Sequence, residues 1–172
     1  MLIVDDDERV RSSLTRNLVI KKGIDVVGEA ADGVEAIAAA VRLMPDVVLM
    51  DVKMPRMGGI EATREITGRL PWVKVLALSG FFDSALMNGM LEAGAAGYLC
   101  KTCGTAEIEA AIRHVAEGGC WLGDEASAVV VAERRSNASS PSPCASIGGE
   151  PAVCTSSELT PRERNCLAAV AS

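Results

Sequence analysis

The 172-residue sequence has few aromatic residues, a single histidine and no long hydrophobic run. Aromatic residues make up only 3%, so a core would have to be built from aliphatic side chains, methionine and alanine. The apolar runs are far shorter than the roughly 20 residues that span a bilayer. A secretory signal would need a longer apolar stretch behind basic residues, whereas Asp5, Asp6 and Asp7 follow directly on the first four residues. These absences predict a cytoplasmic protein that does not enter a membrane.

The chain also lacks an excess of positive charge. It carries 17 lysines and arginines against 23 aspartates and glutamates, which gives a formal net charge of −6. Generic binding of nucleic acid depends on basic contacts to phosphate, so this balance disfavours it. Hydrophobic residues at 49% and charged residues at 23% are ordinary for a globular chain, and they exclude a wholly disordered or collagen-like protein.

Residues 1–118 alternate short apolar runs with stretches in which apolar residues recur every three or four positions. This alternation predicts an α/β fold, in which crossover connections build a parallel sheet that is covered by helices on both faces. The predicted strands cover residues 1–4, 24–27, 47–50, 73–78 and 98–100. The predicted helices cover residues 34–42, 60–70 and 84–93, with further helical stripes over 10–18 and 108–115.

The composition changes after the last of these helices. Residues 124–135 fit one more helix, and residues 136–157 are rich in serine and proline and carry a single charge, which is typical of a flexible linker. Residues 158–172 then have the residue pattern of a new helix start. We therefore predict one domain over 1–118, a helix and linker over 119–157, and the beginning of a second domain over 158–172.

Polar side chains follow four of the predicted strands at the points where those strands end. They are Asp5 and Asp6, Asp51, Ser79, and Lys101. In a parallel sheet these ends share one edge, which is where open α/β folds bind ligands. Crowded carboxylates repel one another unless a cation joins them, and hard oxygen ligands suit Mg²⁺. A lysine and a hydroxyl can contact the oxygens of a phosphoryl group. The set predicts a phosphoryl-transfer site whose nucleophile is a carboxylate.

Four segments carry these residues in order along the chain. They read LIVDD at 2–6, PDVVLMDVKMPRMGG at 45–59, LS at 78–79 and GAAGYLCK at 94–101. Together they resemble the receiver domain of two-component response regulators, over residues 1–118. The resemblance implies a flavodoxin-like (βα)5 fold, a doubly wound parallel sheet with strand order 2-1-3-4-5.

The same resemblance implies which residues accept phosphate and bind metal. Asp51 would be the phospho-acceptor, and the donor would be a phosphohistidine on a sensor histidine kinase. Asp5, Asp6, Asp51 and the backbone carbonyl of Lys53 would hold Mg²⁺. A protein of this kind accepts a phosphoryl group and is not an enzyme in the conventional sense.

Three further residues receive a role in switching from the resemblance. Ser79 and Lys101 would contact the phosphoryl group, and Tyr98 would be the aromatic residue whose rotamer follows Ser79. The surface changed in this way would be recognised by a partner or by a second copy of the chain, so a homodimer is expected on phosphorylation.

Other segments resemble the NarL/FixJ group of response regulators. They read VVGEAADGVEA at 26–36, LEAGAAGYLCK at 91–101 and EGGCWLGDEAS at 117–127. Members of this group end in a LuxR-type helix-turn-helix domain, which commonly opens with a segment like ELTPRE at 158–163. The resemblance implies control of transcription. Too few residues follow that segment to complete the domain, so DNA binding is expected only of a full-length form with a complete helix-turn-helix domain.

Three alternatives remain beside this interpretation. The chain could be a stand-alone receiver that works as a protein-binding module or phosphate sink. It could be an aspartyl-phosphate hydrolase resembling the haloacid dehalogenase family, although that family has a second acid where this chain has Lys53. The Cys100–Cys103 pair could be redox-active or half of a zinc site. A zinc site is disfavoured because no second pair has suitable spacing and His114 is the only histidine.

Overall fold

The structure, a computed structural model, describes residues 1–21 and 23–123. The predicted helix over 124–135, the predicted linker over 136–157 and the segment 158–172 lie outside the described residues. The described helices have 9 to 12 residues, and none is long and apolar enough to cross a membrane. The elements are β1 (Leu2–Val4), α1 (Glu8–Val19), β2 (Gly28–Ala30), α2 (Gly33–Leu43), β3 (Val47–Asp51), α3 (Gly59–Arg69), β4 (Lys74–Ser79), α4 (Ser84–Glu92), β5 (Gly97–Cys100), α5 (Thr105–Ala116) and β6 (Trp121–Leu122).

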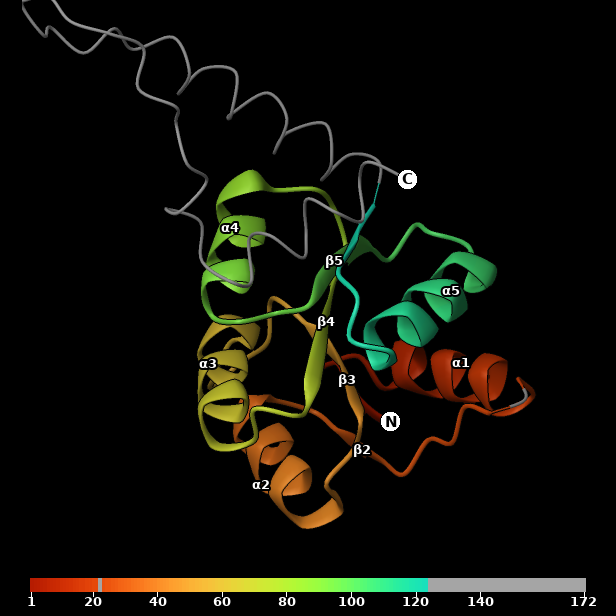
Figure 1. Cartoon of the computed structure of the whole chain (residues 1–172), viewed down its shortest axis with the longest axis horizontal. Coiled ribbons are helices and arrows are strands. Elements are labelled where there is room, and N and C mark those ends of the chain that lie inside the picture. The colour runs from red at the N-terminus through yellow and green to blue at the C-terminus, as the bar shows by residue number, and fades with distance from the viewer. Residues whose placement is uncertain (22, 124–172) are drawn as a thin grey trace, which may run out of the picture.

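The strands form one parallel sheet in the order β2-β1-β3-β4-β5-β6. The first five strands confirm the predicted order. Helices α2, α3 and α4 cover one face of the sheet, and α1 and α5 cover the other (Figure 1). The reversal of strand order falls between β1 and β3, so the carboxyl ends of these two strands flank the crevice in which a doubly wound fold binds its ligand.

Two apolar layers hold the helices to the sheet. On one side, Ala36, Ala62 and Met87 pack against the strands, and on the other side Leu18 and Ile112 do so. The small alanines let the helices approach the sheet closely. The layers consist mainly of valine, isoleucine, leucine, methionine and alanine, as the low aromatic content predicts.

Aspartates begin three of the helices. The side chains of Asp7, Asp32 and Asp83 accept backbone N–H groups at the first turns of α1, α2 and α4. Each carboxylate satisfies donors that have no partner within the helix and lies at the positive end of the helix dipole. The third acid of the amino-terminal cluster, Asp7, therefore serves as a helix cap.

The predicted strand over residues 24–27 lies too early in the chain. The second strand is β2, where Gly28, Glu29 and Ala30 pair with β1. The pairing begins with Leu2 opposite Gly28, and just before it the Val27 N–H donates to the Met1 carbonyl at 2.8 Å. Within this run Ile24 is buried, at 6% exposure, and Val26 is half-buried, so these two residues pack against the core before the strand begins, whereas Val27 is exposed. Glu29 is exposed because β2 is an edge strand, and this hides the strand from a search for apolar runs.

The sixth strand was not predicted. Helix α5 ends before Gly118, which has a φ of +91°, and the chain turns back to place Trp121 and Leu122 beside β5. A Cβ at Gly97 would collide with the carbonyl oxygen of Trp121, so the close approach of β6 depends on this glycine. Two residues are too few to show a period, and no pattern in the sequence marks this strand.

Candidate functional site at the carboxyl edge of the sheet

Three carboxylates meet where β1 and β3 end. These strands are neighbours, with Val4 paired to Met50, so Asp5 and Asp51 emerge side by side. One oxygen from each of Asp5, Asp6 and Asp51 lies within 4.8 Å of the others. Asp5 and Asp51 are buried, at 1% and 5% exposure, whereas Asp6 is exposed. The structure thus brings together the three acids that the sequence predicts.

Lys101 reaches this group from the end of β5. Its Nζ lies 2.6 Å from Asp5 Oδ2 and 3.2 Å from Asp51 Oδ2. Its backbone N–H donates to the Ser79 carbonyl at 2.6 Å, which joins it to the end of β4. One ammonium group therefore bridges the two buried carboxylates. Within the described residues, the pocket combines one positive charge with three acids.

The pKa values of the pocket reflect burial and crowding. Burial raises the pKa of Asp51 and the nearby Asp5 adds to that effect, while the charge of Lys101 opposes it. The other Asp51 oxygen, Oδ1, accepts the Val52 N–H at 2.8 Å. For Lys101, burial alone would lower the pKa, but its contacts with Asp5 and Asp51 outweigh burial and raise the pKa. Lys101 therefore stays protonated at neutral pH, and its single positive charge faces three carboxyl groups.

Replacing Asp51 with asparagine is expected to stabilise the metal-free protein by about 1 kcal/mol at neutral pH. Because the pKa of Asp51 is raised in the folded protein, its contribution to stability is fully present below the ordinary value of 3.8 and is lost as the pH rises through the folded value. Urea denaturation of both proteins, from neutral pH down to below 3.8, measures the difference in their free energies of unfolding. This difference should shrink as the pH falls. The exposed carboxylate gives the control: Asp6→Asn should change stability less. An Asp51→Asn protein less stable than wild type at neutral pH contradicts the expectation.

Ser79 and Tyr98 lie next to the pocket on β4 and β5. Ser79 is buried, and its hydroxyl donates to the Phe81 carbonyl at 2.8 Å. Tyr98 is 1% exposed, and burial raises its pKa. Its ring packs edge to face against Phe82, with 6.2 Å between centroids. Its hydroxyl has no hydrogen-bond partner in the part of the chain that the structure describes. Ser79 thus lies at the end of β4 and Tyr98 lies in β5, and the Ser79 hydroxyl is hydrogen-bonded within the loop that follows β4.

The loop after β3 is joined to its neighbours by contacts that sequence reasoning missed. The Lys53 ammonium lies 4.4 Å from the centroid of the Phe81 ring, which links this loop to the loop after β4. Arg56, with a left-handed φ of 63°, forms ion pairs with Asp32 and Glu35 at the start of α2. No motif signals these contacts, because each joins residues far apart in the chain.

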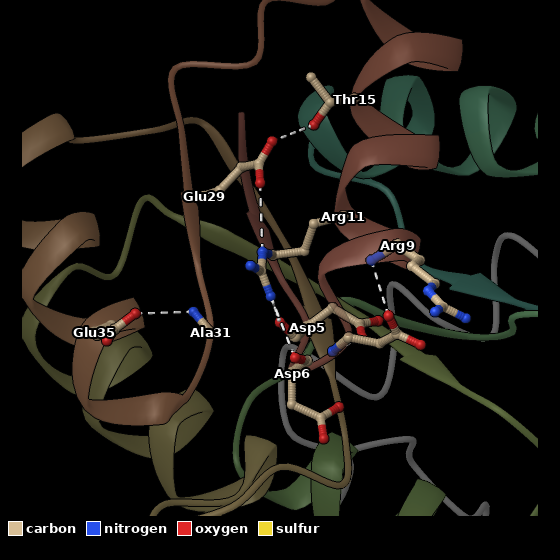
Figure 2. Close-up of polar contacts among 9 residues, drawn as sticks. Asp5, Asp6, Arg9, Arg11, Thr15, Glu29, Ala31 and Glu35 are labelled. Atoms are coloured by element: carbon tan, nitrogen blue, oxygen red, sulfur yellow. Dashed lines mark hydrogen bonds and ion pairs between the residues drawn. The ribbon is translucent and has the colours of Figure 1, made fainter.

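A further arginine lies behind the acids. Arg11 on α1 donates from Nη1 to the Asp5 carbonyl at 2.7 Å and to the Asp6 carbonyl at 3.4 Å (Figure 2). Its side chain is 15% exposed. In the sequence Arg11 is one of several arginines in this helix, and the spacing gives no sign that it differs from the others.

The donor set fits a hard divalent cation. Oxygen atoms from three carboxylates, one of them exposed, match the way in which Mg²⁺ is held by few protein ligands and several waters. Among residues 1–21 and 23–123, Asp5, Asp6 and Asp51 are the one group of three acid, histidine or cysteine side chains that could hold a metal. Cys100 and Cys103 belong to no such group there, which gives the zinc interpretation no support.

The fold and the pocket together define a class of protein: a doubly wound α/β domain with an acidic, lysine-bridged pocket at its topological switch point. Residues 1–113 match the family model described as the response regulator receiver domain. The chain belongs to this family. Receiver domains generally bind Mg²⁺ at their acidic pocket and receive phosphoryl groups from histidine kinases.

Curated relatives are regulators that extend beyond this chain. Response regulator GacA of Pseudomonas viridiflava is 47% identical over 122 residues, which cover 71% of this chain and 57% of that protein. Transcriptional regulatory protein LiaR of Bacillus subtilis is 42% identical over 135 residues, which cover 78% of this chain and 64% of that protein. The chain thus spans less than two thirds of these relatives.

Solved structures similar to this chain are also response regulators. A LuxR-family two-component response regulator from Aurantimonas is 34% identical with a TM-score of 0.74, covering 78% of this chain and 96% of that one. The signal receiver domain of the putative response regulator NarL from Mycobacterium tuberculosis is also 34% identical. Its TM-score is 0.65, and the match covers 68% of this chain and 94% of that one. These likenesses support the NarL/LuxR grouping that the sequence motifs indicate.

Proposed function

We propose that Asp51 accepts a phosphoryl group from a phosphohistidine of a sensor histidine kinase. The observation that carries the proposal is the pairing of Asp51 with Lys101 at the carboxyl end of β3, 3.2 Å between Oδ2 and Nζ. An oxygen of Asp51 forms a bond to phosphorus while the phosphorus–nitrogen bond of the phosphohistidine breaks. The imidazole leaves with the electron pair and takes up a proton. The chain itself is the product, so it is not an enzyme in the conventional sense.

Mg²⁺ would be held by Asp5, Asp6, Asp51 and the Lys53 carbonyl. The clustering of the three acids within 4.8 Å supports this assignment, because crowded carboxylates repel one another unless a cation joins them. When bound, the ion neutralises charge on the phosphoryl oxygens. Lys101, at the end of β5 and 3.2 Å from Asp51 Oδ2, would place its ammonium against the same group.

Ser79 and Tyr98 would report the phosphoryl group to the surface. The Ser79 hydroxyl would exchange the Phe81 carbonyl for a phosphoryl oxygen, which is a stronger, charge-assisted acceptor. Tyr98 would follow, because its buried hydroxyl lies close to Ser79 and would lose that neighbour when the serine turns toward the phosphoryl group. The affected surface, around α4 and β5, would form the contact with a partner or with a second copy of the chain.

The output would be control of transcription by a longer protein. Its relatives include proteins named as transcriptional regulators, and this chain spans only part of their length. We propose a receiver over residues 1–118, a connecting region over 119–157, and a LuxR-type helix-turn-helix domain that begins at 158. DNA binding belongs to the form with that domain complete.

The test is phosphorylation by a small donor. Incubating the protein with Mg²⁺ and acetyl phosphate or phosphoramidate should add one phosphoryl group, read by intact mass. Asp51→Asn should gain none, because an amide is not a nucleophile toward phosphorus. Chelation of Mg²⁺ should suppress the adduct on the wild type. An unmodified wild type, or an adduct that persists in Asp51→Asn, would sink the proposal.

A further inference from the structure

A largely buried arginine, Arg11, lies behind the acidic pocket, with its side chain 15% exposed. Arg11 comes from the first half of α1 and turns its guanidinium toward the loop between β1 and α1. Nη1 donates to the carbonyls of both Asp5 and Asp6, at 2.7 and 3.4 Å (Figure 2). These are the backbone groups of the two acids whose side chains face Asp51. A single side chain therefore holds the main chain of both.

Arg11 is itself held by a second pair of residues. Its Nε lies 3.4 Å from Glu29 Oε2, and the other carboxylate oxygen of Glu29 accepts the Thr15 hydroxyl at 2.7 Å. Glu29 is on β2, opposite Ile3 of β1. The contacts thus tie α1, the loop after β1 and the edge strand into one unit (Figure 2). A planar guanidinium suits this task because its donors are fixed in direction.

Building on the proposed function, we propose that Arg11 is a positioning residue for the divalent cation. It fixes the backbone at Asp5 and Asp6 so that both carboxylates face Asp51. A contact inside the loop complements it: Asp5 Oδ1 accepts the Asp7 N–H at 3.0 Å and so sets the direction of the Asp5 side chain. Loss of Arg11 would free the carbonyls, and the two acids would no longer be held in register with Asp51.

Positioning and simple electrostatics predict opposite signs for this residue. Arg11 carries a positive charge next to the metal ligands, so by charge alone it repels Mg²⁺, and its removal would tighten binding. If Arg11 instead holds the ligands in place, its removal weakens binding. Loss of groups that orient metal ligands typically lowers metal affinity by about 10- to 100-fold. The direction of the change therefore decides between the two roles.

The experiment titrates the full 172-residue chain with MgCl₂ alone by calorimetry. Arg11→Gln should bind Mg²⁺ about tenfold more weakly than the wild type. Arg9→Gln is the matched control: it removes the same charge two residues away from an exposed side chain that points away from Arg11 and Glu29 (Figure 2). It should bind Mg²⁺ as the wild type does or slightly more tightly. Arg11→Lys keeps the charge without the planar fork and should fall between Arg11→Gln and the wild type.

Two further measurements separate positioning from a general loss of structure. Without metal, the Asp7 amide should exchange its hydrogen faster in Arg11→Gln than in the wild type, while amides in α5 keep their protection. Should Arg11→Gln fail to fold, Glu29→Gln decides, because it loosens Arg11 without removing it and should weaken Mg²⁺ binding several-fold. Unchanged or tighter Mg²⁺ binding in a folded Arg11→Gln protein overturns the proposal. The absence of a phosphoryl adduct on the wild type would instead overturn the proposed function and leave these binding results standing.

Discussion

Replacing Lys101 with methionine is expected to lower the free energy of unfolding of the metal-free protein by about 2–3 kcal/mol at neutral pH. Methionine keeps the volume of the side chain but removes the ammonium group. The 2.6 Å and 3.2 Å contacts to Asp5 and Asp51 are then lost, and two buried carboxylates face each other without a cation. Because the pKa of Lys101 is raised, its contribution is fully present below the ordinary value of 10.5, so neutral pH shows the whole loss.

Two treatments should restore the stability that Lys101→Met loses, Mg²⁺ and a lower pH. Neither would correct a general packing defect. Saturating Mg²⁺ restores a cation to the acids, so it should stabilise Lys101→Met more than it stabilises the wild type. Lowering the pH protonates Asp51, whose pKa is raised by burial, and should narrow the difference in stability between the two proteins. Urea denaturation with and without Mg²⁺ measures both effects.

Lys53 provides the matched control for this experiment. It also lies near the pocket, but it is exposed and its ammonium rests on the Phe81 ring. Lys53→Met leaves the backbone carbonyl in place and should cost less than about 1 kcal/mol. If Lys53→Met and Lys101→Met lose the same stability, then Lys101 does not act by neutralising the buried acids.

Much of the fold could be predicted because its strands are buried on both faces. The apolar runs at 47–50 and 73–78 correspond closely to β3 and β4 in the centre of the sheet. At the edges the same reasoning fails. Glu29 of β2 is exposed, and β6 has only two residues, so neither strand contains a continuous apolar run. Hydrophobic patterning thus locates central strands well and edge strands poorly.

The pocket could be predicted in part for a similar reason. Asp5, Asp51 and Lys101 occupy the ends of parallel strands, and parallel strand ends share an edge whatever the details of packing. The contacts of Arg11 and Arg56 depend on which side chains from different elements meet in space. Neither is encoded in a local spacing. The chemistry of the site is therefore visible in the sequence, whereas the groups that hold its loops in place require the structure.

The close approach of α3 to the acceptor strand leads to the second large effect. Helix α3 begins at Gly59, whose N–H donates to the Val52 carbonyl at 3.0 Å. A Cβ at Gly59 would collide with the Asp51 carbonyl oxygen and would lie 3.0 Å from the Val52 Cα. These are backbone atoms, which cannot turn aside as the end of a flexible side chain could. An alanine at this position has to push the helix and the strand end apart.

Gly59→Ala is therefore expected to destabilise the protein by about 2–3 kcal/mol. It should also weaken Mg²⁺ binding, because the displaced backbone carries Asp51 and continues into Lys53. Gly68→Ala tests the reasoning within the same helix. No atom lies within 4 Å of the position that its Cβ would take, so the substitution should stabilise the protein by about 0.5–1 kcal/mol through helix propensity.

The two alanine variants should thus move the urea midpoint in opposite directions, and only Gly59→Ala should change the affinity for Mg²⁺. If Gly59→Ala is as stable as the wild type, the alanine Cβ does not collide with the Asp51 carbonyl. The position of Asp51 then does not depend on this glycine. If Gly59→Ala is destabilised yet binds Mg²⁺ as the wild type does, the substitution has displaced α3 without displacing the end of β3 that carries Asp51. The expected pairing of lower stability with weaker metal binding would show that the start of α3 sets the position of Asp51.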